Sequence, residues 1–501
     1  MAKTSSGNRS GKLLGLRPFN LKLIVRVTGI LLIYMAASMT LPLAVSLYYK
    51  DGAQFALVIS ALLMLMVGLL MRNILGRNAT YELKENESYC ITVLIWLVVP
   101  LFGTLPYIFT GGIESFTDAV FESFSGFTTT GSSVLVKPEQ LPLSLLSYRA
   151  LTQWVGGLGL MLMVLAILRK LTQGSVHLYE AEFSGTQQRK LHPRMSKNVA
   201  RMWYIYGFLT ALMGVLLLVN GTPAVDALCL ACSTVSTGGF TTHSVGLATL
   251  NNGSLIVVTV FMLLSGINVA FLYRFFTLKW KHLGHDEELR AYLLVFLVAV
   301  GVGVIAFKYN GNSTEESILY SIFHMASTMS TCGFNVPRPE HWSFLVSVVT
   351  FILIVTGACA GSTGGGIKLR RLMVLSKYLG NYCTRMLHPN AVFKVKINNE
   401  VVETDYINKI FAYVFLYIVF IIGGAFVLTL CGCSIPDATC MAAANISNLG
   451  PSNIINSLGA NLNYAELPHL AKWTLTVLMV AGRLELFALI AVFSPAYWRR
   501  R

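Results

Sequence analysis

Long stretches without a single charged side chain run through this sequence. Residues 27–49 contain no Asp, Glu, Lys or Arg, and neither do residues 227–273. About 20 apolar residues cross the hydrocarbon core of a bilayer, so these stretches predict transmembrane helices. Only 12% of the 501 residues are charged, against about 25% in soluble domains. With 54% hydrophobic residues, the chain is neither a water-soluble globular protein nor a disordered one.

The apolar segments recur in a fixed order. Two leading spans are followed by four cycles, each with a full span, a half-length apolar helix, a glycine-containing turn and a second span. Two leading spans and two spans in each of four cycles give ten predicted crossings. The predicted spans are residues 27–49, 52–71, 88–113, 150–168, a segment between 201 and 226, 254–273, 291–307, 342 into the glycine-rich 357–366, 410–431 and 473–496. The half-length helices are predicted near residues 116–126, 226–236, 317–328 and 437–447.

This order predicts an all-α membrane protein in which two leading transmembrane helices precede four pseudo-symmetric repeats around one pore. Each repeat is expected to contain a transmembrane helix, a pore helix, a filter loop and a second transmembrane helix. We expect a cytoplasmic N-terminus at residues 1–26, leading helices at 27–87, repeat 1 at 88–176, a cytoplasmic linker and repeat 2 at 177–285, repeat 3 with a cytoplasmic hairpin at 286–404, and repeat 4 at 405–501.

The basic residues predict the orientation of the spans. Clusters of Lys and Arg lie within residues 72–84, 169–201, 274–290, 368–396 and 499–501, whereas residues 220–253 and 431–469 have neither. The positive-inside rule therefore predicts a multi-pass protein with both termini in the cytoplasm and the glycine turns in the external half. The same rule explains the net charge of +15. No nucleic-acid-binding motif is present, so membrane lipid and not nucleic acid is the expected surrounding.

The four turns share one sequence frame. Each has a small polar residue, then Thr or Asn, then any residue, then Gly. The turns are Thr128-Thr129-Thr130-Gly131, Ser236-Thr237-Gly238-Gly239, Ser330-Thr331-Cys332-Gly333 and Ser447-Asn448-Leu449-Gly450.

Irregular backbone at membrane depth is tolerated where it lines a water-filled pathway. A ring of carbonyls replaces the hydration shell of a cation, Gly permits the backbone angles of such a turn, and helices ending there direct negative dipole ends at the centre. The four turns therefore predict a selectivity filter. It lacks the acidic ring of a divalent-cation channel, so K⁺ or Na⁺ is expected. The alternative is ordinary re-entrant loops with Gly for packing.

Two further features suit a gate. Gly357, Gly361, Ser362, Thr363, Gly364, Gly365 and Gly366 interrupt a span in the third cycle. A phosphate-loop frame fails there, because Ile367 separates Gly366 from Lys368. We interpret the segment as unwound backbone below the filter, with a small-residue packing face as the alternative. Arg483 lies in the middle of the last span, two residues before Glu485; an intramembrane charge marks an ion pathway or an ion pair.

Two smaller features carry weaker predictions. Glu122, in the first half-length helix, is either a cation attractor at the entrance or a hydrogen-bonded structural acid. Residues 392–402 alternate between apolar and polar around Asn398-Asn399. This pattern predicts a cytoplasmic β-hairpin that offers a surface to a soluble partner; a solvated loop is the alternative, because isolated hairpins are marginally stable.

The chain resembles the Trk/Ktr/HKT superfamily of potassium transporters. The resemblance lies in the four-cycle pattern with single filter glycines, in Gln153-Trp154-Val155-Gly156-Gly157-Leu158-Gly159, and in Gly482-Arg483-Leu484-Glu485. The two leading helices match the TrkH branch. The resemblance implies K⁺ uptake across the bacterial inner membrane, gating by an intramembrane loop and a pore-facing Arg483, a homodimer with one pore per subunit, and a cytoplasmic nucleotide-binding partner of TrkA type.

The expected cargo is thus K⁺ at the filter, with no transition metal, no organic cofactor and no enzymatic activity. A Na⁺-permeable or Na⁺/H⁺-coupled transporter of the same architecture is the alternative, although Gly131 stands where a Ser would favour Na⁺. A membrane-embedded enzyme is more remote, because no nucleophile, base or metal cluster is arranged near the interface. The sequence leaves open whether transport is passive or coupled to H⁺ or Na⁺.

Overall fold

A computed structural model describes residues 20–77, 85–159, 195–277, 286–309, 313–335, 344–388, 390, 393–450 and 464–494. The leading helices are α1 (Leu21–Ser38), α2 (Thr40–Tyr49) and α3 (Gln54–Leu70), which continues as the π-helix η1 (Met71–Leu75). Helices α1 and α3 pack closely at Gly29 and Gly68. A Cβ atom built on either glycine would lie 2.7 Å from the carbonyl oxygen of the other. Small residues at such crossings let two membrane helices approach each other.

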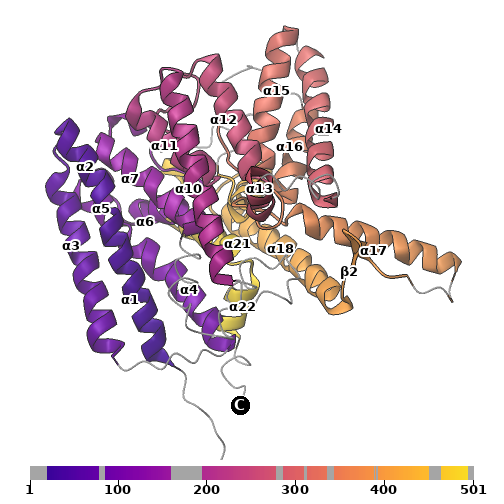
Figure 1. Ribbon diagram of the computed structural model, residues 1–501, viewed down its shortest axis with the longest axis horizontal. Coiled ribbons are helices and arrows are strands. Elements are labelled where there is room, and N and C mark those ends of the chain that lie inside the picture. Colours follow the sequence, from indigo (N-terminus) through magenta and orange to yellow (C-terminus); the bar gives the residue numbers. More distant parts are fainter. Residues whose placement is uncertain are drawn as a thin grey trace, which may run out of the picture.

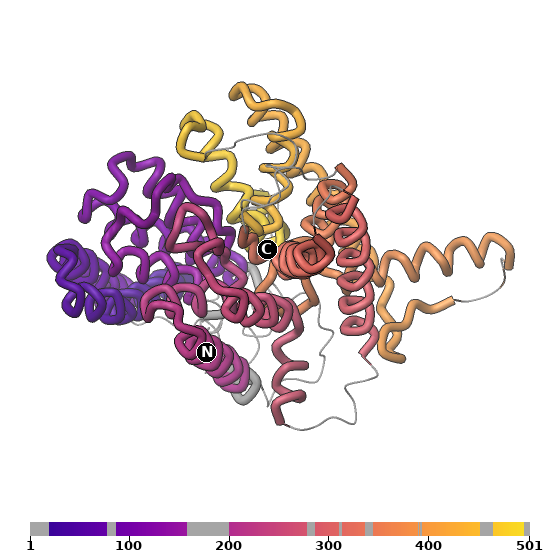
Figure 2. Tube along the Cα trace, turned by 90° about the horizontal axis from the view of Figure 1, so that it is seen from above, coloured from indigo at the N-terminus to yellow at the C-terminus, as the bar shows by residue number. Residues whose placement is uncertain are grey.

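Four repeats follow, and Figure 2 shows them arranged in chain order around a common centre. Repeat 1 has α4 (Glu85–Phe102), α5 (Leu105–Phe109), α6 (Phe116–Phe127), η2 (Pro138–Gln140), α7 (Leu143–Trp154) and η3 (Val155–Gly159). Repeat 2 has α10 (Met195–Val219), α11 (Ala224–Val235), α12 (Asn252–Ser265) and α13 (Val269–Phe276).

Repeat 3 has α14 (Glu287–Tyr309), α15 (Thr314–Met329), α16 (Phe344–Thr356), α17 (Leu369–Leu387), β1 (Lys396–Ile397) and β2 (Glu400–Val401). Repeat 4 has α18 (Thr404–Leu430), α19 (Ile435–Ile446), η6 (Tyr464–Glu466), α21 (His469–Arg483) and α22 (Phe487–Phe493). Helix α17 projects from the body on the side opposite the leading helices (Figure 1). The predicted two-leading-helix, four-repeat architecture is confirmed.

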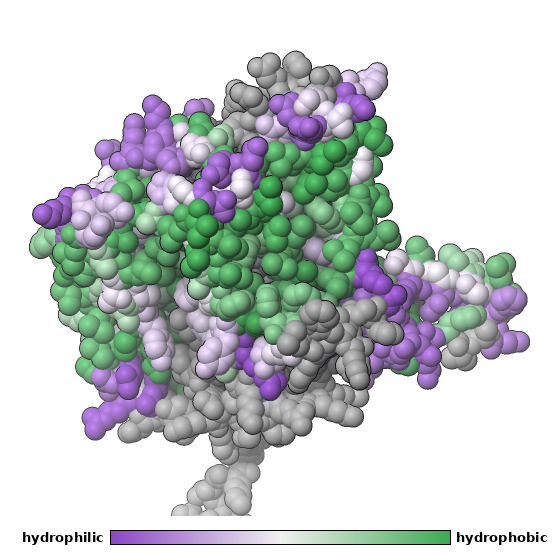
Figure 3. Space-filling view, turned by 45° about the horizontal axis from the view of Figure 1, so that its top comes forward, coloured by the Kyte–Doolittle hydropathy of each residue, from purple (hydrophilic) through white to green (hydrophobic). Residues whose placement is uncertain are grey.

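Many helices of this body expose large apolar side chains. In Figure 3 apolar side chains cover the middle of the visible face, and hydrophilic side chains lie at its margins. On α14, Leu294, Leu297 and Ile305 are 64%, 65% and 70% exposed, as is expected where lipid rather than water covers the helix. By length and composition, six described helices are able to cross a membrane, or up to eight if each bent pair counts as one span. Ten crossings also require α16 and the segment that begins at α7, which continues outside the described residues.

Two predicted spans are wrong in one respect, because they are broken and not continuous. Residues 254–273 form α12 and α13, which meet at 112°. Asn268 sits at the break, where its side-chain oxygen accepts from Ala270 N at 2.8 Å and caps α13. The described part of the predicted span 473–496 is divided between α21 and α22, which meet at 111°, with Glu485 and Leu486 at positive φ. Hydropathy cannot detect such breaks when both flanks are apolar.

The predicted hairpin is confirmed, with Val392 outside the described residues. Strands β1 and β2 pair antiparallel, with Lys396 opposite Val401 and Ile397 opposite Glu400. Asn398 and Asn399 take φ values of 49° and 64°, the left-handed pair of a tight hairpin turn in which Asn is favoured.

Candidate functional site

The four predicted filter turns adopt the same backbone conformation. Each follows a half-length helix: α6, α11, α15 or α19. The second residue of each turn has φ near +55°, although none is a glycine: Thr129 (55°), Thr237 (57°), Thr331 (61°) and Asn448 (52°). The fourth residue is the glycine, again with positive φ: Gly131 (83°), Gly239 (80°), Gly333 (77°) and Gly450 (73°). Left-handed backbone is uncommon for residues other than Gly, and its recurrence at one position indicates a functional constraint.

Hydrogen bonds to the preceding helix hold each turn in the same register. The third residue of each turn donates its N–H to the carbonyl five residues earlier. The bonds are Thr130 N to Ser125 O (2.9 Å), Gly238 N to Ser233 O (2.7 Å), Cys332 N to Ser327 O (3.0 Å) and Leu449 N to Ala444 O (3.0 Å). They use carbonyls that a helix C-terminus leaves without intrahelical partners.

The four turns meet one another in a closed ring, which we call the filter ring. A Cβ atom built on any filter glycine would fall on a carbonyl oxygen of the next turn: Gly131 on Gly238, Gly239 on Cys332, Gly333 on Leu449, and Gly450 on Thr130. The last contact returns to the first repeat, so the ring has four members and is closed. Only glycine allows neighbouring backbones to approach this closely.

The electrostatics of the filter ring favour a cation. The C-terminal ends of α6, α11, α15 and α19 all lead into it, and the C-terminus of a helix carries about half a negative charge. Five of the sixteen turn residues are glycines, namely Gly131, Gly238, Gly239, Gly333 and Gly450. The other eleven carry side chains, and each of these residues is at most 2% exposed. None is acidic or basic, so carbonyl and hydroxyl oxygens are the ligands that the ring offers.

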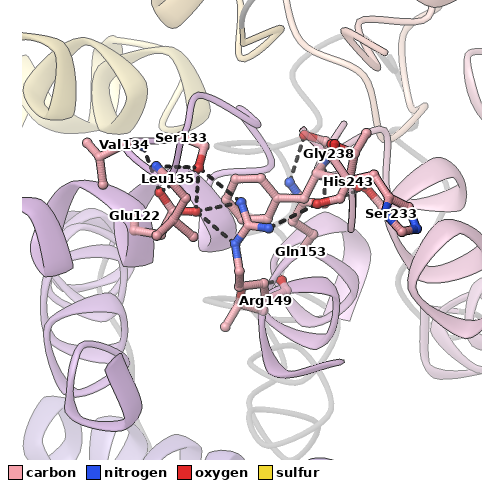
Figure 4. Close-up of polar contacts among 12 residues, drawn as sticks. Glu122, Ser133, Val134, Leu135, Arg149, Gln153, Ser233, Gly238 and His243 are labelled. Carbon is pink, nitrogen blue, oxygen red and sulfur yellow. Dashed lines mark hydrogen bonds and ion pairs between the residues drawn. The ribbon is translucent and has the colours of Figure 1, made fainter. Parts of the chain in front are cut away.

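A buried ion pair braces the first filter turn. The Glu122 carboxylate is fully buried and accepts from the Arg149 guanidinium at 2.6 Å, from Ser133 Oγ at 3.0 Å and from Val134 N at 3.0 Å (Figure 4). Of the two roles open for Glu122, this geometry favours the structural acid. From the sequence, Arg149 could be recognised only as a basic residue outside the cytoplasmic clusters. The available signal for this ion pair was a charged residue among apolar neighbours in a predicted membrane segment, because such a charge needs a partner.

The glycine-rich segment of the third cycle is unwound, as predicted. Residues 357–368, which we call the intramembrane loop, separate α16 from α17. Gly365 N donates to Thr331 Oγ1 of the filter ring at 2.8 Å, and Thr363 Oγ1 donates to Val235 O at the end of α11 at 3.3 Å. A Cβ on Gly365 would fall on the carbonyl of Ser447. The loop therefore lies directly against the third and fourth turns and against the end of the helix that leads into the second.

Arg483 joins the filter ring to the intramembrane loop. Its guanidinium donates to Thr129 Oγ1 at 3.3 Å, to Thr363 O at 3.1 Å and to Gly156 O at 2.8 Å. Arg483 also lines a cavity together with Asn448 of the fourth turn and Gly364, Gly365 and Gly366 of the loop. Glu485, in contrast, contacts Arg371 at 2.5 Å. The structure thus brings Arg483 into contact with the intramembrane loop and with the filter ring.

Comparison with known proteins agrees with this geometry. The profile of the TrkH family, described as a cation transport protein, matches residues 59–500. The chain belongs to the TrkH family. It is 34% identical to the Trk system potassium uptake protein TrkH of Halomonas elongata, over 96% of this chain and 100% of that protein. It is 33% identical to the protein of the same name from Escherichia coli K12, over 95% of this chain and 99% of that one.

A solved TrkH structure has the same fold. The crystal structure of the potassium transporter TrkH from Vibrio parahaemolyticus superimposes with a TM-score of 0.85 at 28% identity, covering 96% of this chain and 100% of that one. The predicted resemblance to the TrkH branch is confirmed over almost the whole chain, and this TrkH-family member is accordingly a multi-pass membrane protein.

Proposed function

We propose that this TrkH-family protein carries K⁺ into the cell across the inner membrane through the filter ring. The observation that supports the proposal is the closed contact of four glycines with four carbonyls of neighbouring turns. A ring of carbonyls of this kind can replace the water around a monovalent cation. The relatives from Halomonas elongata and Escherichia coli are named potassium uptake proteins. We also infer that the chain performs no covalent chemistry and holds no organic cofactor, its cargo being K⁺.

The purified chain in lipid vesicles tests this proposal. Vesicles loaded with K⁺ should accumulate external Rb⁺ in a protein-dependent manner, and excess external K⁺ should compete more strongly than excess Na⁺. Protein-free vesicles are the control. Equal competition by Na⁺ would favour the Na⁺-permeable alternative, and an absence of protein-dependent Rb⁺ uptake would refute K⁺ transport. An imposed proton or Na⁺ gradient then separates passive flux from coupled transport.

The orientation is part of the proposal. We propose that both termini lie in the cytoplasm and the filter ring in the external half, because the sequence segments rich in Lys and Arg alternate with the segments that carry the four turns. Cys383 on α17 is exposed and provides a natural reporter. A membrane-impermeant maleimide should label Cys383 in inverted vesicles and leave it unlabelled in spheroplasts, with Cys383→Ser as control. Labelling in spheroplasts would reverse the assignment.

The proposed assembly is a homodimer bound to a nucleotide-binding partner of TrkA type. Helix α17 exposes Leu379, Met386 and Leu387 by 62%, 71% and 78%, and the adjoining hairpin lies beside its first half, where Lys377 Nζ donates to Lys396 O at 2.8 Å. These surfaces could receive cytoplasmic subunits. For the homodimer, light scattering of the purified protein should give twice the mass of one chain. For the partner, an immobilised protein of TrkA type should retain the chain but not a variant with Asn398 and Asn399 replaced by Ala.

Two neighbouring carboxylates connect this hairpin to the proposed gate. Glu287 Oε1 accepts from Asn398 N at 3.1 Å, and Glu288 Oε1 accepts from Ala360 N of the intramembrane loop at 2.6 Å. A partner that displaces the hairpin would thus move the start of α14 and, through it, the loop. Replacing Glu287 by Ala should weaken the partner's effect on Rb⁺ flux while leaving flux without the partner unchanged.

A further inference from the structure

The second turn of the filter ring differs from the others at one position. Thr130, Cys332 and Leu449 carry side chains at the third place, whereas the second turn has Gly238. A Cβ atom at Gly238 would fall on the Cδ atom of Gln153. The space that a side chain fills in the other turns is therefore occupied by a residue from α7 of repeat 1.

Three hydrogen bonds fix the Gln153 amide against the second turn. Its nitrogen Nε2 donates to Gly238 O at 2.7 Å. Its oxygen Oε1 accepts from Ser233 Oγ at 2.6 Å and from Phe240 N at 3.2 Å. In Figure 4 the Gln153 side chain extends from α7 toward the second turn at Gly238. Gln153 is fully buried, so its amide needs these bonds to avoid buried polar atoms without a partner.

Arg149 lies one helical turn before Gln153 on the same face of α7. Its guanidinium donates to Thr241 O at 3.1 Å and lies 4.1 Å from the centre of the Phe240 ring. Helix α7 of repeat 1 thus holds the backbone of residues 238–241 of repeat 2. This support is needed there, because Gly238 and Gly239 are consecutive glycines, which have the widest conformational freedom of any dipeptide.

We propose that Gln153 is a positioning residue for ion selectivity, which fixes the Gly238 carbonyl in the filter ring through its side-chain amide. The position and field strength of the carbonyls decide how well a filter distinguishes K⁺ from Na⁺. A freed Gly238–Gly239 peptide rotates and accommodates the smaller ion equally well. The proposal rests on the proposed K⁺ transport and adds the residue that sharpens its selectivity.

Gln153→Leu removes the three bonds at nearly constant volume. The measurement uses purified protein in vesicles and compares how strongly external K⁺ and external Na⁺ inhibit Rb⁺ uptake. We expect the preference for K⁺ over Na⁺ to fall about two- to tenfold, the range that one net hydrogen bond supplies. Gln140→Leu, on the exposed η2, is the matched control and should keep the parent's ratio. An unchanged ratio in Gln153→Leu overturns the inference. Absent Rb⁺ uptake by the parent protein refutes K⁺ transport instead.

A second pair of variants tests the shared space and remains informative if Gln153→Leu fails to fold. Gly238→Ala alone should lose most Rb⁺ uptake, because the new methyl group meets Gln153. Gly238→Ala combined with Gln153→Ala should recover uptake, with the K⁺ to Na⁺ ratio still below that of the parent. A double variant no more active than Gly238→Ala, or one that recovers the parent's ratio, would overturn the assigned role.

Discussion

The Glu485 carboxylate lies 2.5 Å from the Arg371 guanidinium. Both side chains are largely buried, at 12% and 4% exposure. Glu485 stands at the break between α21 and α22 with φ of 52°, and Arg371 lies in the first turn of α17. Arg371 also lies 4.1 Å from the centre of the Tyr413 ring. The pair therefore fastens the helix break of repeat 4 to the helix that follows the intramembrane loop.

Replacing Glu485 by Gln should destabilise the protein. The variant removes the carboxylate charge that pairs with buried Arg371, and breaking a buried ion pair typically costs about 3–5 kcal/mol. We expect a lower melting temperature of the detergent-solubilised protein, followed by the fluorescence of a thiol-reactive dye. Glu400→Gln, in the exposed strand β2, should melt with the parent; equal shifts for both variants would contradict a role for the buried pair.

Replacing Arg483 by Ala should raise cation flux several-fold. The guanidinium places a positive charge beside Thr129 of the filter ring and Thr363 of the intramembrane loop, where it repels a passing cation. Rb⁺ uptake per unit of protein in the vesicle membrane measures the effect. Arg483→Lys, which keeps the charge, should stay near the parent's flux. If Arg483→Ala has the parent's flux at equal protein content, Arg483 is not a barrier.

Replacing Gly239 by Ser should damage selectivity. The new Cβ atom would fall on the carbonyl oxygen of Cys332, and φ is +80° at this position, a conformation that costs a non-glycine residue about 1–3 kcal/mol. We expect the K⁺ to Na⁺ preference in Rb⁺ competition to fall several-fold. Gly423→Ser on α18, where a Cβ meets nothing within 4 Å, is the matched control. If the parent, Gly239→Ser and Gly423→Ser show the same preference for K⁺ over Na⁺, Gly239 does not contribute to selectivity.

The shared conformation of the four turns could be predicted from sequence because its signal is local and repeated. Gly131, Gly239, Gly333 and Gly450 each stand three residues after the helix cap, so four independent segments report the same turn. Their φ values follow from chain-local sterics, which residue type reveals. The intramembrane loop was predictable for the same reason, since its glycines cluster within one short segment.

The contacts that brace the filter could not be predicted in this way. Gln153 and Gly238 lie 85 positions apart in the sequence, and Arg371 and Glu485 lie 114 positions apart. The residues next to them in the sequence do not indicate which distant residue each contacts. The broken helices were missed because hydropathy is averaged along a span, and both spans are apolar as a whole. Asn268 and Glu485 were the available signals there, since a polar residue inside a span needs a specific partner. Helix-period reasoning does not say which polar residue ends a helix.

Asp51 should make stability depend on acidity. Asp51 lies between the spans Leu21–Tyr49 and Gln54–Leu75, and its carboxylate accepts from Ser144 N, in the first turn of α7, at 2.9 Å. Burial raises the pKa of Asp51, but hydrogen bonds from Ser46, Ser144 and Ala53 outweigh burial and hold this pKa below its usual value. A lowered pKa means that the folded protein favours the charged carboxylate, as does the positive N-terminus of a helix.

The sign of the pH effect follows from linkage. The stabilisation by Asp51 is fully present above the unfolded pKa of about 3.9 and is lost as the pH falls through the lower folded pKa. At pH 7 the Asp51→Asn variant should therefore melt below the parent protein, and the gap between their melting temperatures should close as the pH is lowered toward 3. Because Asp51 is partly exposed, salt should narrow the gap at pH 7. A gap that widens on acidification would show that the carboxylate is not stabilised in its charged form.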